Sequence, residues 1–294
     1  MQDILVVQDL VKSFRQVRAV NGVSFSLAEG TCFGLLGPNG AGKTTTIEMM
    51  EGILSPDSGR ILYRGRPIDA DFKKRAGIQF QHTSLPDYLT VSETIRLFQS
   101  FYPEPRRFDD IVEICSLSDI LTRDNKKLSG GQRQRLLLAI AIVPKPDIVF
   151  LDEPTTGLDP QARRNFWDLI RRIQDEGSTI VLTTHYMDEA HMLCDEIAIM
   201  DHGRILELDA PQALIDRYFD GVLVRIPVGN PNGMDFPLPE GAVIRDNALE
   251  LTSTRLDETV RNLIGVGLSL DGLSVHKPTL EDLFIKLTGN TLRA

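Results

Sequence analysis

Near the N-terminus, a glycine-rich segment, GPNGAGKTT at 37–45, lies between the apolar run TCFGLL and the helical pattern TTIEMMEG. Its glycines would let backbone N–H groups turn toward one anion, and the helix N-terminus adds its dipole. Lys43 would bring a point charge to the β and γ phosphates of a nucleotide, and the Thr44 hydroxyl suits Mg²⁺. The alternative, a turn that binds nothing, leaves a lysine where the helix dipole opposes it. The predicted phosphate cradle comprises Gly37, Pro38, Asn39, Gly40, Ala41, Gly42, Lys43, Thr44 and Thr45.

Two acidic residues, Asp152 and Glu153, end the apolar run in DIVFLDEP. In open α/β sheets, ligands collect at the carboxyl ends of the strands. One carboxylate there can hold Mg²⁺ through water, while a second orients or deprotonates an attacking water. We assign Asp152 to the metal and Glu153 to the water. Alternatively, both are solvated acids that cap the helix expected after Asp159.

A histidine, His185, ends another apolar run, STIVLTTH. A histidine at this strand end can donate a hydrogen bond to the γ-phosphate and help to hold the attacking water. In isolation it would be interpreted as a structural residue, but its position in an α/β architecture favours the catalytic role.

A second glycine-bearing turn opens the helical pattern LSGGQRQRLLLAIAIV. Ser129 is expected to cap this helix, and its dipole points at the turn, which makes another anion site. One chain has little use for two sites on one phosphate tail. Two copies facing head to tail would let each turn cradle the nucleotide bound to the other copy. The predicted turn residues are Ser129, Gly130, Gly131 and Gln132.

The elements that must position these residues alternate between strands and helices. Short apolar runs recur (ILVV, TCFGLL, AGIQF, DIVFL, STIVLTT and EIAIM), several without polar alternation, as in parallel strands covered on both faces. Helical patterns follow three of them, which predicts βαβ units. Between about 85 and 145 the strand signal stops and three amphipathic helices are expected. The predicted fold is α/β, with a helical subdomain inserted in the core.

A smaller α+β domain is expected at 216–294, after a first domain at 1–215. Its predicted strands are GVLVRIPV, AVIRD, ALELT and LSLDGLSV, with a loop at PNGMDFPLPEG and a helix at 256–264. A last helix, TLEDLFIKLTG, has leucines and a phenylalanine on one face, acids at its start and Gly289 at its end.

Composition narrows the function classes further. The 41 acidic and 32 basic side chains leave a net charge of −9, which disfavours a nucleic-acid partner. The odd set of three cysteines without CxxC spacing fits reduced, buried thiols. The N-terminus does not read as a signal peptide, and the longest apolar run, LLLAIAIV, is too short to span a bilayer. We therefore expect a cytoplasmic protein.

The ordered motifs resemble those of the ATP-binding-cassette (ABC) ATPases, which have a P-loop NTPase core. LSGGQ resembles the family's signature, and the phosphate loop, Gln81, the signature, DIVFLDEP, GLDP and TTH follow in the family's order over about residues 1–215. The resemblance implies binding and hydrolysis of ATP with Mg²⁺. It places Gln81 on the metal or the water, Asp159 at the dimer interface and Phe14, where a tyrosine is frequent, against adenine.

The ending HKPTLEDLFIKLTG is similar to that of the ATPases serving export systems, including ABC-2 and drug or polysaccharide exporters. The resemblance implies a subunit bound to the cytoplasmic face of the membrane through a membrane-spanning permease. It also implies a second ATPase subunit, most simply a second copy of this chain. An importer ATPase, a non-catalytic regulatory cassette and a soluble cassette acting on nucleic acid or ribosomes are the alternatives. The C-terminal helix argues against an importer ATPase, and the complete set of catalytic residues argues against a regulatory cassette. The acidic charge and the single cassette argue against a partner that is nucleic acid or a ribosome.

Overall fold

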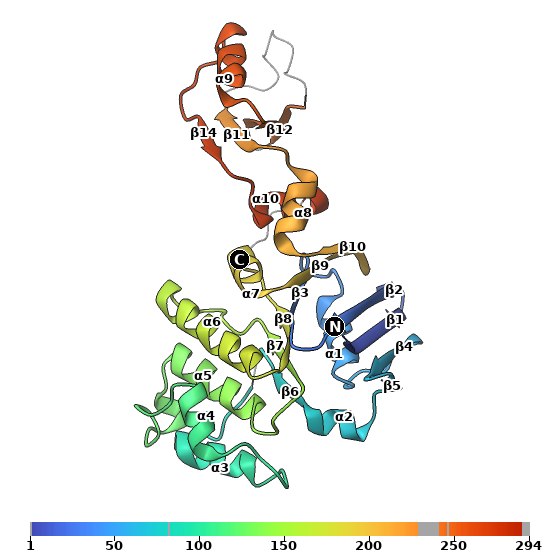
Figure 1. Ribbon diagram of the computed structural model, residues 1–294, viewed down its shortest axis with the longest axis vertical. Coiled ribbons are helices and arrows are strands. Elements are labelled where there is room, and N and C mark those ends of the chain that lie inside the picture. Colours follow the sequence, from blue (N-terminus) through green and yellow to red (C-terminus); the bar gives the residue numbers. More distant parts are fainter. Residues whose placement is uncertain (1, 82, 229–240, 246, 290–294) are drawn as a thin grey trace. The chain divides into compact units, whose positions relative to one another are not determined.

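The computed structural model describes residues 2–81, 83–228, 241–245 and 247–289 (Figure 1). The chain divides into two compact units, one running to Pro211 and one from Gln212 to Gly289. The first unit contains the predicted nucleotide site and is built on two sheets.

A six-stranded sheet forms the centre of the first unit, in the order β10-β9-β3-β8-β7-β6. All strands run parallel except β10, which pairs antiparallel with β9. The apolar runs predicted as buried strands are confirmed, because β3, β7 and β8 are buried almost throughout. The strands are β3 (Cys32–Leu36), β6 (Ala76–Gln79), β7 (Ile148–Asp152), β8 (Thr179–Thr183), β9 (Glu196–Asp201) and β10 (Arg204–Asp209).

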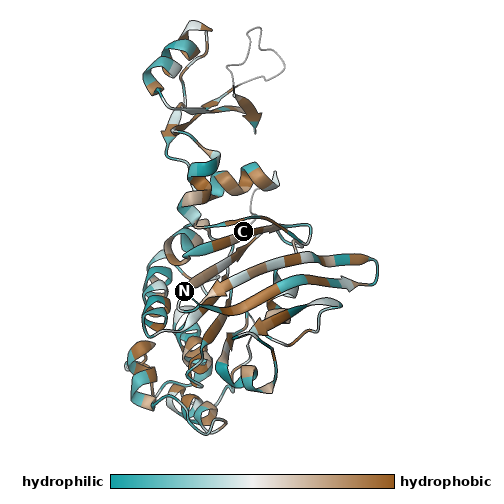
Figure 2. Ribbon diagram, turned by 45° about the vertical axis from the view of Figure 1, so that its right-hand side comes forward, coloured by the Kyte–Doolittle hydropathy of each residue, from teal (hydrophilic) through white to brown (hydrophobic). Residues whose placement is uncertain are grey.

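A four-stranded antiparallel sheet, in the order β2-β1-β4-β5, packs on the central one. The two share a hydrophobic core in which Phe25 of β2 stacks on Phe33 of β3 at 4.9 Å between ring centroids. Figure 2 shows hydrophobic residues along the strands of this unit and hydrophilic ones on its outer helices. Only the ILVV part of this sheet was predicted. Its strands are β1 (Asp3–Phe14), β2 (Val17–Ala28), β4 (Ser58–Tyr63) and β5 (Arg66–Pro67).

The helical insert follows β6 and contains the three predicted helices. Thr90 caps α3 in a reciprocal capping box with Glu93, and Ser129 caps α5 in the same way with Gln132. The helices of the first unit are α1 (Lys43–Met50), α2 (Ala70–Arg75), α3 (Val91–Gln99), α4 (Phe108–Ile114), the 3₁₀ turn η1 (Asn125–Lys127), α5 (Gly130–Ala141), α6 (Pro160–Asp175) and α7 (Met187–Leu193).

The second unit is an antiparallel sheet, β12-β13-β11-β14, with its own hydrophobic core, which confirms the α+β expectation. The strand predicted over LSLDGLSV is wrong for its first part, because Gly272 turns the chain at φ 75° and pairing starts only at Ser274. The predicted loop at 231–241 lies outside the described residues except for Gly241. The elements are α8 (Pro211–Tyr218), β11 (Val222–Pro227), β12 (Val243–Arg245), β13 (Ala248–Ser253), α9 (Leu256–Gly265), β14 (Ser274–His276) and α10 (Leu280–Thr288).

The last helix has the predicted start and stop signals. Thr279 and Asp282 form a capping box at its N-terminus, and Gly289 closes it in the left-handed conformation at φ 67°. Leu280, Leu283 and Phe284 are buried. In the described ranges, none of the helices combines the length and the apolar character that a bilayer span requires. The three cysteines are buried and free, as expected.

Candidate nucleotide and hydrolysis site

The phosphate loop joins β3 to α1, and its backbone conformation requires glycine. Gly40 and Gly42 have φ values of 82° and 101°, in the region that disfavours side chains. A Cβ atom on Gly42 would lie 2.2 Å from the carbonyl oxygen of Ala19. The first turn of α1 has no side-chain cap, so its N–H groups face the loop without a partner from a capping residue.

The Lys43 side chain is buried and folds back over this loop. Its Nζ donates hydrogen bonds to the carbonyl oxygens of Gly37 (2.8 Å) and Pro38 (3.2 Å). Burial lowers the pKa of Lys43, while the nearby charges of Glu153 and Asp152 act to raise it. A buried ammonium among loop carbonyls and open N–H groups fits a site that receives a phosphate chain.

Asp152 is the last residue of β7 and Glu153 directly follows it, next to the end of β8. The Thr183 hydroxyl donates to Asp152 Oδ1 (2.6 Å) and accepts the Glu153 backbone N–H (3.1 Å). Glu153 has φ 47°, a conformation that costs energy in a non-glycine residue and turns its side chain out of the strand register. Thr183 was not predicted, although its position two residues before the histidine in TTH was an available signal.

The Glu153 carboxylate is where the predicted catalytic side chains meet. Gln81 Nε2 donates to its Oε2 (2.7 Å), and the Thr156 hydroxyl donates to the same oxygen (3.3 Å). His185 Nε2 contacts its Oε1, and the Nδ1 atom of that ring is buried without a partner among the described residues. The neighbouring strands β6, β7 and β8 end at one edge of the sheet, which brings residues 72 and 32 positions apart together.

A further buried acid, Glu51, directly follows α1 as its C-terminal capping residue. It is 4% exposed. Burial raises the pKa of this carboxyl to about 8, and the charges of Asp152 and Glu48 add to the effect. No sequence pattern singled out this residue.

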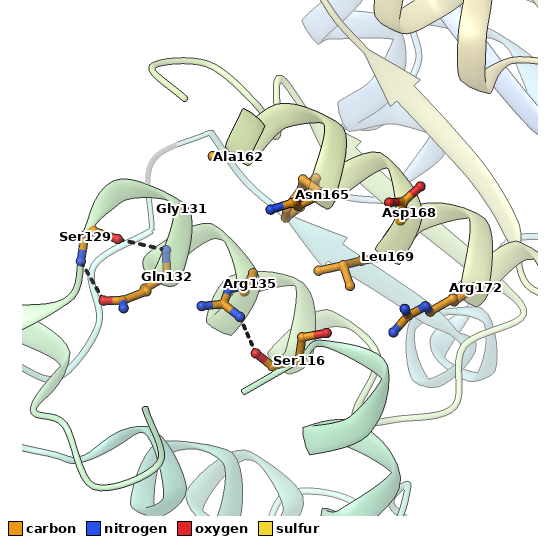
Figure 3. A pocket seen from close by; sticks show the side chains of 11 residues that line it. Ser116, Ser129, Gly131, Gln132, Arg135, Ala162, Asn165, Asp168, Leu169 and Arg172 are labelled. Atoms are coloured by element: carbon orange, nitrogen blue, oxygen red, sulfur yellow. Dashed lines mark hydrogen bonds between the residues drawn. The ribbon is translucent and has the colours of Figure 1, made fainter. Parts of the chain in front are cut away.

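The signature turn forms the N-terminus of α5, and its own side chains satisfy it. Ser129 Oγ accepts the Gln132 N–H (3.4 Å), and Gln132 Oε1 accepts the Ser129 N–H (3.0 Å). Ser129 and Gly130 are exposed. A cavity of about 420 Å³ opens beside the turn, between α5 and α6 (Figure 3). Among the described residues, no hydrogen bond or ion pair joins this turn to the phosphate loop.

Two residues that the family resemblance singled out lie on other elements. Phe14 is at the end of β1, 46% exposed, with Lys12 Nζ 5.8 Å from its ring centroid. Asp159 caps α6, where its Oδ1 accepts the Ala162 N–H (2.8 Å).

A link between the edge strand and the signature helix was not predicted. Gln79, at the end of β6, donates through Nε2 to Gln134 Oε1 in α5 (2.5 Å). Gln79 is 2% exposed, so the bond lies away from competing water.

Comparison with known proteins identifies this arrangement. The ABC transporter family model matches residues 20–156. Nod factor export ATP-binding protein I of a Rhizobium species is 36% identical over 96% of this chain and 95% of the relative, and that of Ralstonia nicotianae is 35% identical over 99% and 95%. The structure of cbiO1 from Clostridium perfringens, part of the ABC transporter complex cbiONQ, has a TM-score of 0.69 at 29% identity, over 74% of this chain and 92% of its own.

The chain belongs to the ATP-binding proteins of ABC transporters. It is an ABC-type ATPase coupled to transport, and the predicted resemblance to the export-type proteins is confirmed.

Proposed function

We propose that this chain hydrolyses ATP at the Glu153 carboxylate and uses the cycle to drive export through a separate membrane-spanning subunit. The observation that supports this most directly is the convergence of Gln81, Glu153 and His185 beside the buried Lys43. Each of them comes from the carboxyl end of a neighbouring strand, where an α/β sheet binds its ligands.

The residues around the phosphate loop fit ATP and Mg²⁺. The cradle of 37–45 would hold the phosphate chain, with Lys43 on the β and γ phosphates and the Phe14 ring against adenine. The Thr44 hydroxyl, the Gln81 amide and the Asp152 carboxylate offer oxygen ligands, which a hard cation such as Mg²⁺ prefers. Thr183 orients the Asp152 carboxylate for this role. When bound, Mg²⁺ would neutralise charge on the phosphate oxygens.

Glu153 would accept a proton from the attacking water. Gln81 and Thr156 both donate to its Oε2, which fixes the carboxylate plane and leaves Oε1 on the side of His185. His185 would then donate a hydrogen bond to the γ-phosphate, so this bond would replace its contact with Glu153 Oε1 when ATP binds.

Two copies of the chain would close head to tail around two ATP molecules. In the signature turn Ser129 and Gly130 are exposed, and among the described residues no hydrogen bond joins the turn to the phosphate loop of its own chain, so the turn is free to reach the nucleotide of another. Asp159 begins α6 beside this turn and would lie at the same interface. We propose a homodimer, because one chain contains both complementary surfaces.

The membrane subunit would dock on the segment that follows Gln81 and on the helical insert. Three large aromatic side chains in or next to these parts are exposed, namely Phe80 (44%), Tyr88 (90%) and Phe101 (65%). An apolar partner surface would cover them. The chain would then sit on the cytoplasmic face, and the membrane subunit would select the cargo. The relatives above are named for Nod factor export, which supports export as the direction.

The test is the variant Glu153→Gln in the full-length chain. The amide keeps the shape but cannot take a proton, so kcat is expected to fall by about a hundredfold or more while ATP remains bound. The exposed Glu113→Gln provides the control for a lost carboxylate. Unchanged hydrolysis in Glu153→Gln would reject the assignment, and recovery of a membrane protein with the chain from detergent extract would test the docking.

A further inference from the structure

A buried carboxyl, Glu189, joins two segments that flank the hydrolysis site. It lies in α7 with no exposed surface. Its Oε1 accepts two hydrogen bonds, from the Thr155 hydroxyl (2.8 Å) and from the Trp167 indole N–H (2.8 Å). Thr155 belongs to the loop between Glu153 and α6, whereas Trp167 lies inside α6.

The loop that contains Thr155 lies next to both the Glu153 carboxylate and the signature turn. Thr156, the next residue, donates to Glu153 Oε2, and the Thr155 carbonyl accepts the Leu158 N–H (3.1 Å), which closes the turn. A Cβ atom built on Gly130 or Gly131 of the signature turn would lie 3.8 and 3.9 Å from Leu158 Cδ2. A displacement of this loop would therefore reach the catalytic carboxylate and the signature turn together.

A second segment, which contains His185, leads into α7, where Glu189 lies. Thr184 is buried, and its hydroxyl accepts the Tyr186 N–H (3.0 Å), so it fixes the backbone on the far side of His185. Tyr186 is held from α6 by the Arg163 guanidinium, 3.6 Å from its ring centroid.

We propose that Glu189 is a positioning residue that holds the loop at 154–158 in place beside Glu153. It acts through Thr155 and does not touch the substrate. The inference rests on the proposed role of Glu153.

The protonation state of Glu189 sharpens the design of the test. Burial raises the pKa of this carboxyl, although its hydrogen-bond partners oppose the shift. Its Oε2 is buried without a partner among the described residues, so the hydrogen bonds that matter converge on Oε1. A glutamine keeps an acceptor oxygen for both donors, whereas alanine removes it.

The two donors to Oε1 supply a matched pair of variants in the full-length chain. Thr155→Val removes the donor on the loop, and Trp167→Phe removes the donor inside α6. Both should lower the midpoint of urea denaturation to a similar extent. Only Thr155→Val should lower kcat, by about tenfold, with the KM for ATP changed less than about twofold, because the phosphate loop is untouched.

Glu189→Ala should reproduce the loss of kcat, and Glu189→Gln should restore it to within about twofold of the native chain. Equal loss of kcat in Thr155→Val and Trp167→Phe, or unchanged kcat in Thr155→Val, would overturn the proposal, and this pair decides even where Glu189→Ala does not fold. If the proposed function itself is wrong, the result is different: ATP hydrolysis would survive in Glu153→Gln.

Discussion

Two glycine-bearing turns lead into helices in this chain, and they differ in how the N–H groups of the first helical turn are paired. The phosphate loop enters α1 through Gly42 in a left-handed conformation, with no side-chain cap and a buried lysine folded over it. The signature turn enters α5 through Ser129 in extended conformation, and its Ser129–Gln132 capping box ties two of its N–H groups to side-chain oxygens.

The two turns therefore differ in how complete each is within its own chain. The phosphate loop has a backbone fixed by close contacts and donors without side-chain partners, so it awaits a ligand. The signature turn is stable by itself, and its glycines have only ordinary or loose contacts. Its exposed surface is open to a ligand brought by another molecule, which supports the two-chain proposal. Four predictions test this contrast, in decreasing order of their effect on the free energy of unfolding.

The largest effect is expected for Gly42→Ala. The methyl group would meet the Ala19 carbonyl at 2.2 Å in a left-handed backbone. Strain and overlap together should lower the free energy of unfolding by about 4 kcal/mol and abolish ATP binding. Urea denaturation and titration with ATP measure both. Gly40→Ala is the control, because it has a similar φ but open space, and it should lose only about 1 to 2 kcal/mol.

The next effect is a pH dependence from Glu51 at the far end of α1. Its pKa is raised from 4.5 to about 8, so the folded state holds the proton more tightly and stability falls as pH rises between these values. From about pH 6 to about pH 8 the loss should be about 2 kcal/mol. Denaturation without nucleotide or Mg²⁺ measures it, and Glu51→Gln should flatten the curve. An equally steep curve in that variant would assign the dependence to another group.

A smaller effect is expected for Ser129→Ala. Loss of a side-chain cap lowers the free energy of unfolding by about 1 kcal/mol. Gln132→Ala, which removes the reciprocal half of the box, should cost a similar amount, and the double variant should cost less than the sum because the two bonds depend on each other. Additive losses in the denaturation series would contradict a reciprocal box.

The smallest effect on stability is expected for Gly131→Ala. The added Cβ would meet Ala162 Cβ at 3.6 Å, an ordinary contact, so the free energy of unfolding should change by less than about 0.5 kcal/mol. Hydrolysis should nevertheless fall by about tenfold, because the methyl group occupies the surface offered to the partner's nucleotide. Gly265→Ala is the control for an added methyl group, because it lies in open space in the second unit and should leave hydrolysis unchanged. Normal turnover in Gly131→Ala would remove the signature turn from the mechanism.

The sequence predicted best those features whose cause is local. The phosphate loop, the acid pair and the cap at Ser129 depend on neighbouring residues, and the apolar strands have buried surroundings on both faces. Strand β2 was missed because its apolar residues alternate with polar ones and are interrupted by Gly22, and β4 was missed because only its last three residues are apolar. The contact of Gln81 with Glu153 joins distant segments, so only the motif order of the family pointed to it. Thr183 could have been inferred from its place in the TTH motif, whereas the role of Glu189 depends on three-dimensional packing, which no spacing in the chain reveals.

The central sheet ends on one side with β6, which pairs with β7 alone among the described strands. An outer strand can tilt without tearing the pairs inside the sheet. Gln79 in this strand donates to Gln134 of the signature helix, and Gln81, two residues further on, donates to the Glu153 carboxylate. This one strand is therefore connected both to the signature helix and to the Glu153 carboxylate. If the membrane subunit docks as proposed above, a pull on the chain beyond Gln81 would move both contacts together, which would couple cassette closure directly to water activation.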